Sequence, residues 1–183
     1  ETVDVDLTAF MAPAQTTFDS PPLAHLRLVD IFEDDHVWVT LDEGCNSNCH
    51  GRKWAQNAEE KFDKQYKLYP EWVHRDRKTY SGIGGSAGSE TIGKKVFPYR
   101  IVGNTGAVSG CIESNELRNQ DHVPFLLSLP AQVKFGMVKN LMQGTVTLPQ
   151  EGEVELCRCA RSGLLVIRLS LIHISEPTRP NFI

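Results

Sequence analysis

Long apolar runs and clustered basic charge are both missing from this chain of 183 residues. No apolar stretch reaches the roughly 18 residues that a membrane-spanning helix needs, and no signal peptide is recognisable. The formal net charge is −4, and the Lys and Arg residues are scattered without interleaved aromatic side chains. A nucleic-acid-binding surface requires the opposite pattern, so we expect neither nucleic acid nor a membrane as a partner.

Cysteine is scarce, with five residues in the whole chain. An odd number of cysteines without a secretory signal indicates reduced thiols, not a disulfide framework, and we therefore expect an intracellular, cytoplasmic location. The length fits one domain with flanking segments. Because the chain begins at Glu1 without Met, we expect it to be a piece of a longer protein.

The segment at 37–45, VWVTLDEGC, is an apolar strand that ends in an acid and a glycine turn. Side chains alternate faces along a strand, so Val37, Val39 and Leu41 share one face, and Asp42 lies on the other. Gly44 allows the backbone to turn tightly away. The pattern predicts that the Asp42 carboxylate lies at a strand end, outside the sheet.

A glycine-rich segment follows further along the chain, with the sequence SGIGG at 81–85. Predicted strands at 72–80 and 93–102 flank it, which indicates a β-hairpin with a deformable tip. The one apolar side chain in this tip, Ile83, could close over an extended peptide. Polar residues at 104–107 after the second strand favour a turn, although an internal copy of the acid motif with an amide in place of the acid is an alternative.

The order of three elements resembles that of the retropepsin-like aspartic proteases of retroelements. These elements are the acid loop, the glycine flap, and a closing apolar strand at 123–129 that leads into a short helix at 130–135. The resemblance covers about 37–148. It implies a mainly β fold, a small closed β-barrel with a glycine flap hairpin, to which this chain adds an amphipathic helix at 52–68. It also implies an aspartic endopeptidase that needs no cofactor and cleaves an extended polypeptide, the polyprotein that contains it.

The resemblance assigns roles to individual residues. Asp42 would be the catalytic acid, and Glu43, Gly44 and Cys45 would complete the active-site loop. The flap that contacts substrate would consist of Ser81, Gly82, Ile83, Gly84 and Gly85. Two carboxylates must share a proton in this chemistry, and the chain supplies one, so the resemblance implies a homodimer.

Glu43 departs from the family pattern, in which Thr or Ser follows the aspartate and braces the two active loops of the dimer. A second carboxylate beside Asp42 would tend to raise the proton affinity of the site. Two alternatives therefore stay open at this loop: a catalytically inactive retropepsin-like binding or dimerisation module, and an Asp42 that only caps a turn.

A third interpretation is a small zinc-binding module. Cys45, Cys49 and His50 carry ligand atoms that suit zinc, but a Cys-x3-Cys-His spacing without a second cysteine pair nearby is unusual. The alternative for these cysteines is a pair of packed thiols, so we expect no metal site.

The sequence predicts the following domain boundaries. Residues 1–30 would be a linker or disordered arm, 31–150 the retropepsin-like domain, and 151–168 a flanking strand or linker. The remainder, 169–183, contains LSLIHISEPTR, which resembles the conceptual translation of a sequencing-library adapter. We expect this tail not to pack on the domain.

Overall fold

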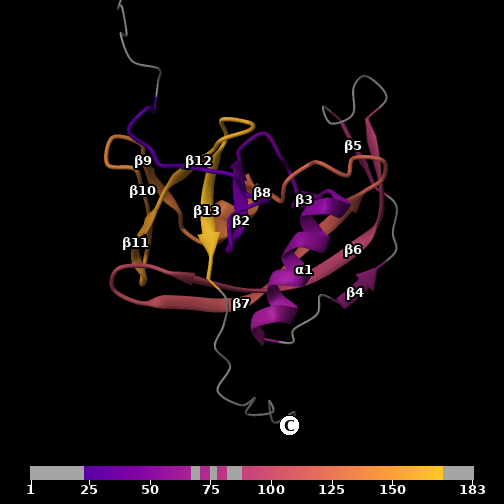
Figure 1. Cartoon of the computed structure of the whole chain (residues 1–183), viewed down its shortest axis with the longest axis horizontal. Helices are drawn as coiled ribbons and strands as arrows, with labels where there is room; N and C mark the ends of the chain where they lie inside the picture. Colours follow the sequence, from indigo (N-terminus) through magenta and orange to yellow (C-terminus); the bar gives the residue numbers. More distant parts are fainter. Residues whose placement is uncertain (1–22, 67–70, 75–77, 82–87, 171–183) are drawn as a thin grey trace, which may run out of the picture.

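The computed structural model describes residues 23–66, 71–74, 78–81 and 88–170 of the chain. This part is mainly β, as predicted, with two helices on a large sheet (Figure 1). The predicted flap-tip residues Gly82, Ile83, Gly84 and Gly85 lie outside the described residues. The elements in chain order are β1 (Leu28–Val29), β2 (Val37–Asp42), β3 (Cys49–His50), α1 (Arg52–Tyr66), β4 (Glu71–His74), β5 (Thr79–Tyr80), β6 (Ser89–Val102), β7 (Ala107–Leu117), β8 (Leu126–Ser128), α2 (Leu129–Lys134), β9 (Val138–Asn140), β10 (Thr145–Leu148), β11 (Gly152–Glu155), β12 (Cys157–Cys159) and β13 (Leu165–Leu169).

Ten strands form one sheet, whose order is β1-β12-β13-β2-β8-β3-β7-β6-β4, with β5 paired to β6 beside this path. The strands β9, β10 and β11 form a second, three-stranded sheet. β2 lies inside the large sheet, antiparallel to β13 on one side and parallel to β8 on the other. The acid at its end is therefore held by a strand that is paired along both edges.

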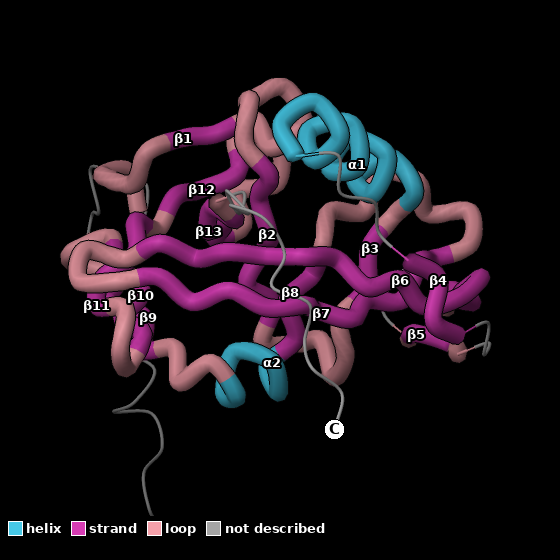
Figure 2. Tube along the Cα trace, turned by 90° about the horizontal axis from the view of Figure 1, so that it is seen from below, coloured by secondary structure: helices cyan, strands magenta, loops and turns pink. Residues whose placement is uncertain are grey.

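The long hairpin of β6 and β7 spans the width of the molecule, with α1 on one side of it and α2 on the other (Figure 2). Its turn is closed by a hydrogen bond from Gly103 N to Gly106 O (2.8 Å). Asn104 Oδ1 accepts a hydrogen bond from Glu153 N (2.9 Å) at this turn. Residues 104–106 thus form a hairpin turn, Ala107 begins β7, and no copy of the acid loop is located there.

The alternation predicted for β2 is confirmed by the two separate clusters in which its buried side chains pack. Val37, Val39 and Leu41 belong to the main apolar core, whereas Trp38 packs in a separate cluster on the other face of the strand. The helix predicted at 52–68 is also confirmed as α1, and its side chains Trp54, Ala58 and Phe62 are buried in the main core. Their spacing of four residues places them on one face of the helix. The indole Nε1 of Trp54 donates to Trp38 O (2.8 Å), which fixes α1 to the strand that carries Asp42.

The short helix predicted at 130–135 is present as α2, one residue earlier. It ends because Gly136 adopts a left-handed conformation, with φ of 65°, which glycine tolerates at no steric cost. Since α2 begins directly after β8, the parallel neighbour of β2, its position is set by the same strand pair that positions Asp42.

Three predicted boundaries differ from the structure. Residues 28–29, expected in a terminal arm, form β1, which pairs with β12. Residues 151–168, expected to flank the domain, form β11, β12 and most of β13, and β13 is the direct neighbour of β2. Leu169, the first residue of the predicted tail, pairs with Val37 and is buried, and Ser170 forms a bridge with Arg100. The alternation of apolar and polar residues in these segments is weak, so only their pairing with distant strands shows that they belong to the sheets. Residues 171–183 lie outside the described residues.

Within the described residues, neither helix combines the length and apolar character required to cross a membrane.

Candidate active site

Asp42 occupies the last position of β2 and is half-buried. We call residues 42–48 the acid loop. Asp42 Oδ1 accepts a hydrogen bond from Gly44 N (2.9 Å), and Asp42 O accepts one from Cys45 N (3.4 Å). A Cβ atom at Gly44 would lie 3.2 Å from Asp42 Oδ1, so a larger residue there would crowd the carboxylate. The local sequence therefore places this carboxylate at the strand end in a defined orientation, as predicted.

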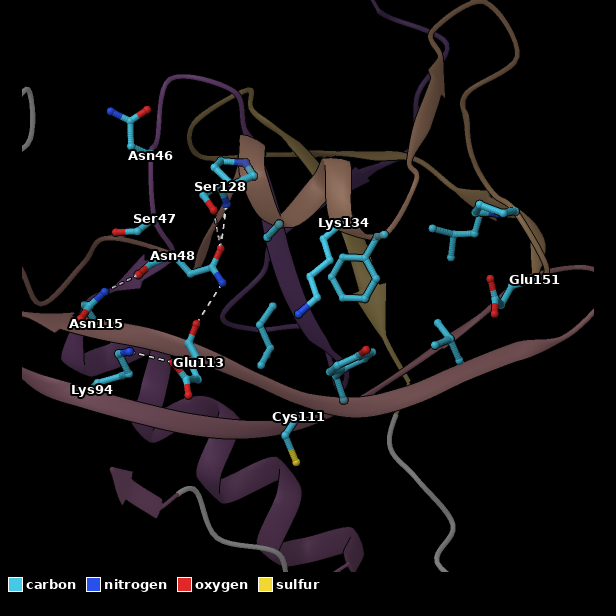
Figure 3. A pocket seen from close by; sticks show the side chains of 18 of the residues that line it. Asn46, Ser47, Asn48, Lys94, Cys111, Glu113, Asn115, Ser128, Lys134 and Glu151 are labelled. Carbon is cyan, nitrogen blue, oxygen red and sulfur yellow. Dashed lines mark hydrogen bonds and ion pairs between the residues drawn. The ribbon is translucent and has the colours of Figure 1, made fainter. Parts of the chain in front are cut away.

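Asn48, at the far end of the acid loop, joins the loop to two other strands (Figure 3). Its Oδ1 accepts hydrogen bonds from both the backbone N and the Oγ of Ser128 in β8 (2.9 Å each). Its Nδ2 donates to Glu113 O in β7 (2.9 Å), and its backbone O accepts from the Asn115 backbone N (3.0 Å) and Nδ2 (3.1 Å). Ser128 is the residue paired with Asp42 across β2 and β8. Asn48 thus anchors the acid loop to the strand beside Asp42.

The base of the predicted flap lies against the acid loop. We call residues 78–81 the flap base; it includes β5, which pairs with β6 as a hairpin. The hydroxyl of Tyr80 is hydrogen-bonded to Ser47 Oγ, donates to Asn48 O (3.2 Å) and accepts from Asn115 Nδ2 (2.8 Å). Burial raises the pKa of this hydroxyl, so it stays protonated. A single tyrosine therefore connects the flap base to the loop that carries Asp42.

A hollow of about 360 Å³ opens between the acid loop and the flap base. The acid loop contributes Asp42, Gly44, Cys45, Asn46 and Ser47 to its wall, and the flap base contributes Lys78, Thr79, Tyr80 and Ser81. Among the predicted flap residues, Ser81 is thus placed at the same hollow as Asp42.

A larger groove of about 820 Å³ shares Asn46, Ser47 and Lys78 with this hollow, so the two adjoin. Figure 3 shows part of its lining, in which the β6–β7 hairpin forms one wall and α2 another. Together the two spaces have room for an extended chain, since binding clefts for drug-sized ligands are about 300–1,000 Å³.

Glu43, which follows Asp42 in the acid loop, forms an ion pair with Lys139 of β9. The Glu43 side chain is 57% exposed and that of Lys139 is 18% exposed. Burial lowers the pKa of the Lys139 ammonium, and the nearby negative charge of Asp42 acts in the opposite direction. The extra carboxylate beside Asp42 is therefore compensated by a cation that the sequence does not place near it.

The three weak zinc candidates do not converge. Cys45 Sγ and Cys49 Sγ lie 3.8 Å apart. His50 follows Cys49 in β3 and points away from it, where its ring packs among Trp54, Phe97 and Phe125 and its Nδ1 bonds Ser114 Oγ (2.8 Å). No group of three His, Cys, Asp or Glu side chains suited to a metal ion occurs within the described residues. Adjacent strand residues face opposite sides, which explains why a Cys-His pair in sequence does not form a pair of ligands here.

A buried charged cluster behind the site was not predicted from the sequence. His50 Nε2 lies 3.7 Å from Glu116 Oε2, and Lys95 Nζ lies 3.0 Å from the same oxygen. Burial lowers the pKa of His50, so its ring is neutral near pH 7. Burial opposes ionisation of Glu116, but its neighbours His50 and Lys95 hold its pKa at about 2. Glu116 is therefore ionised inside the protein, next to β3 and the end of the acid loop.

Comparisons of the chain with models of protein families, with curated protein sequences and with solved structures found no match.

Proposed function

We propose that this chain is an aspartic endopeptidase of retropepsin type that cleaves a retroelement polyprotein as a homodimer, with Asp42 as the catalytic acid of each copy. The observation that carries the proposal is the shared hollow: the half-buried Asp42 at the end of β2 lines one wall, and the flap base lines the other. The proposal also includes a closed barrel of retropepsin type, which is a more specific prediction than the mainly β structure described above.

In this mechanism two Asp42 carboxylates, one from each copy, share a proton and hold a water molecule between them. One carboxylate takes a proton from the water as it attacks the peptide carbonyl, and the other gives a proton to the carbonyl oxygen. Like charges at hydrogen-bonding distance cannot both be present, so the pair would hold one proton, and we expect activity on the acid side of neutral.

The substrate would be an extended polypeptide that pairs its backbone with the flap strands, as an added strand. The larger groove next to Asn46 and Ser47 gives room for residues away from the cleaved bond. Glu43 cannot brace the two active loops as the family hydroxyl does, but its ion pair with Lys139 places a positive charge beside it and so reduces the repulsion expected between Glu43 and Asp42.

The test compares wild type with Asp42→Asn in hydrolysis of a mixed-sequence peptide library at mildly acidic pH. We expect cleavage by wild type, none by Asp42→Asn, and unchanged circular dichroism, because the substitution removes proton chemistry and keeps the shape. Asp35→Asn is the control: Asp35 is exposed and precedes β2, so the same charge change there should leave cleavage intact. Equal cleavage by wild type and Asp42→Asn would refute the assignment.

An inactive binding or dimerisation module is the second candidate, favoured by Glu43 in place of the hydroxyl that braces the active dimer. A pepstatin-type inhibitor separates the two functions, because it mimics the tetrahedral intermediate. Thermal stabilisation of wild type by this inhibitor, lost in Asp42→Asn, would support the peptidase. Dimers by sedimentation without cleavage or inhibitor binding would favour the module.

A further inference from the structure

Two cysteine thiols lie side by side where the acid loop meets β3: Cys45 belongs to the loop and Cys49 to the strand. Cys45 Sγ and Cys49 Sγ are 3.8 Å apart, and Cys45 also donates a hydrogen bond to Ser47 O (2.9 Å). Both residues are buried, and they form a small apolar cluster with Leu117 and Leu126. The proposed peptidase chemistry uses neither sulfur.

The two thiols differ in access. Cys45 lines the hollow next to Asp42 and is 6% exposed, so a small solute that enters the hollow lies against this residue. Cys49 is 0% exposed and does not line the hollow. A solute in the hollow therefore contacts Cys45, whereas Cys49 can react only with Cys45 after Cys45 has been modified.

The thiols also differ in reactivity. The hydrogen bond from Cys49 lowers the pKa of Cys45 to about 7, and the same interaction, together with burial, raises the pKa of Cys49. Thiolates are the reactive form of cysteine, and a thiol with a pKa near the ambient pH is the best attacking group. Cys45 thus has the properties of an attacking thiol, with Cys49 positioned to complete the reaction.

We propose that Cys45 and Cys49 form a redox modification site: hydrogen peroxide that enters the hollow oxidises them to a reversible disulfide that joins the acid loop to β3. The Cys45 thiolate attacks one peroxide oxygen, which breaks the O–O bond; a proton completes the departing water and leaves Cys45 as a sulfenic acid. The Cys49 sulfur then attacks the Cys45 sulfur, and the hydroxyl leaves as a second water with the proton of Cys49. In total two thiols are oxidised to one disulfide while one peroxide is reduced to two waters.

Disulfide formation would change the hollow. The sulfurs must approach from 3.8 Å to about 2.0 Å, and the bond from the Cys45 thiol to Ser47 O is lost with its proton. Ser47 is the residue whose side chain bonds Tyr80 of the flap base. Oxidation therefore acts on the contact between the acid loop and the flap base, whether or not Asp42 is catalytic.

The experiment follows the thiols by mass spectrometry in Cys111→Ser protein, because Cys111 is an exposed cysteine that would react independently. Reduced protein is treated with one equivalent of hydrogen peroxide, denatured, alkylated and digested with trypsin. The tryptic peptide of residues 28–52 contains Cys45 and Cys49 and no other cysteine, whereas Cys157 and Cys159 fall on separate peptides. We expect the 28–52 peptide to be unalkylated and lighter by two hydrogen atoms, and to regain two alkyl groups if a reductant precedes alkylation.

The buried pair Cys157 and Cys159 is the matched control within the same chain, and it should stay alkylated. Oxidation of both pairs to the same extent, or full alkylation of Cys45 and Cys49 after peroxide, would overturn the proposal. Single variants test the order of the steps. With glutathione disulfide as the probe, Cys49→Ser should form a lasting mixed disulfide at Cys45, whereas Cys45→Ser should leave Cys49 unreacted; rapid reaction of Cys49 in Cys45→Ser would refute the assigned roles.

Discussion

Lys139 of β9 forms an ion pair with Glu43 of the acid loop, and this pair joins the three-stranded sheet to the end of the strand that carries Asp42. The two residues are far apart in the chain, and the charge near Asp42 can be judged only when both are considered. Glu43 by itself adds a like charge beside Asp42, whereas the pair is close to neutral. The departure from the family pattern is therefore less severe electrostatically than the acid motif alone indicates.

Removal of Lys139 should expose Asp42 to the uncompensated charge of Glu43. We expect Lys139→Gln to move the acid limb of the cleavage profile to higher pH and Glu43→Gln to move it to lower pH, because a nearby carboxylate favours protonation of its neighbour. In a double-mutant cycle measured by urea unfolding, the interaction energy between Lys139 and Glu43 should stay below about 1 kcal/mol, because the Glu43 side chain is exposed to solvent. Lys53→Gln, which removes an exposed cation of α1 away from both spaces, is the control; a shift of equal size in this variant would show that total charge decides the profile.

Asn48→Ala should destabilise the domain and loosen the acid loop. The variant leaves the buried Ser128 N and Oγ without their partner, and unpaired buried polar groups cost about 1–3 kcal/mol. Urea unfolding by fluorescence measures the change. Asn46→Ala is the matched control in the same loop, since Asn46 is exposed and its side chain bonds no other described residue; its effect should stay within about 0.5 kcal/mol. Equal losses in both variants would show that Asn48 does not anchor the loop.

Tyr80→Phe should weaken the contact between the flap base and the acid loop. The variant keeps the ring and removes the hydroxyl that bonds Ser47, Asn48 and Asn115, for an expected loss of about 1 kcal/mol. We also expect faster amide hydrogen exchange in β5. The control is Tyr99→Phe, because the Tyr99 hydroxyl bonds no other described residue. Unchanged exchange in β5 would mean that the tyrosine does not hold the flap base.

Acid should unfold the domain through Glu116. The folded pKa of about 2 lies below the ordinary glutamate pKa of 4.5, so the unfolded chain takes up this proton first as the pH falls. The stability contributed by Glu116 is complete above about pH 4.5 and is lost as the pH falls towards 2, up to about 3 kcal/mol.

Burial lowers the pKa of His50, so the unfolded ring is protonated before the folded one. His50 therefore adds a loss of stability that begins as the pH falls below 6.5, the ordinary pKa of histidine. In urea unfolding over a pH series, Glu116→Gln should be less stable than wild type at pH 7. It should also lose less stability than wild type between pH 5 and 2. Parallel pH dependences of the two proteins would contradict the role of Glu116.

The sequence by itself determined the local elements. Alternation at 37–42 predicts β2 with Asp42 at its end, the spacing of Trp54, Ala58 and Phe62 predicts α1, and Gly136 predicts the end of α2. These features depend on neighbours within a few residues, so the periods of strand and helix are visible in the sequence. The mainly β class follows from the same signals.

Only the tertiary structure decided which distant segments meet at the acid loop. Tyr80, Ser128 and Lys139 contact the loop from three different elements, and no local pattern marks them as neighbours of Asp42. The same holds for β13, whose weak alternation at 165–169 gives no sign that it pairs with β2. Strand pairing and ion pairs between segments far apart in the chain depend on the packing of the whole domain, because each partner alone fits many environments.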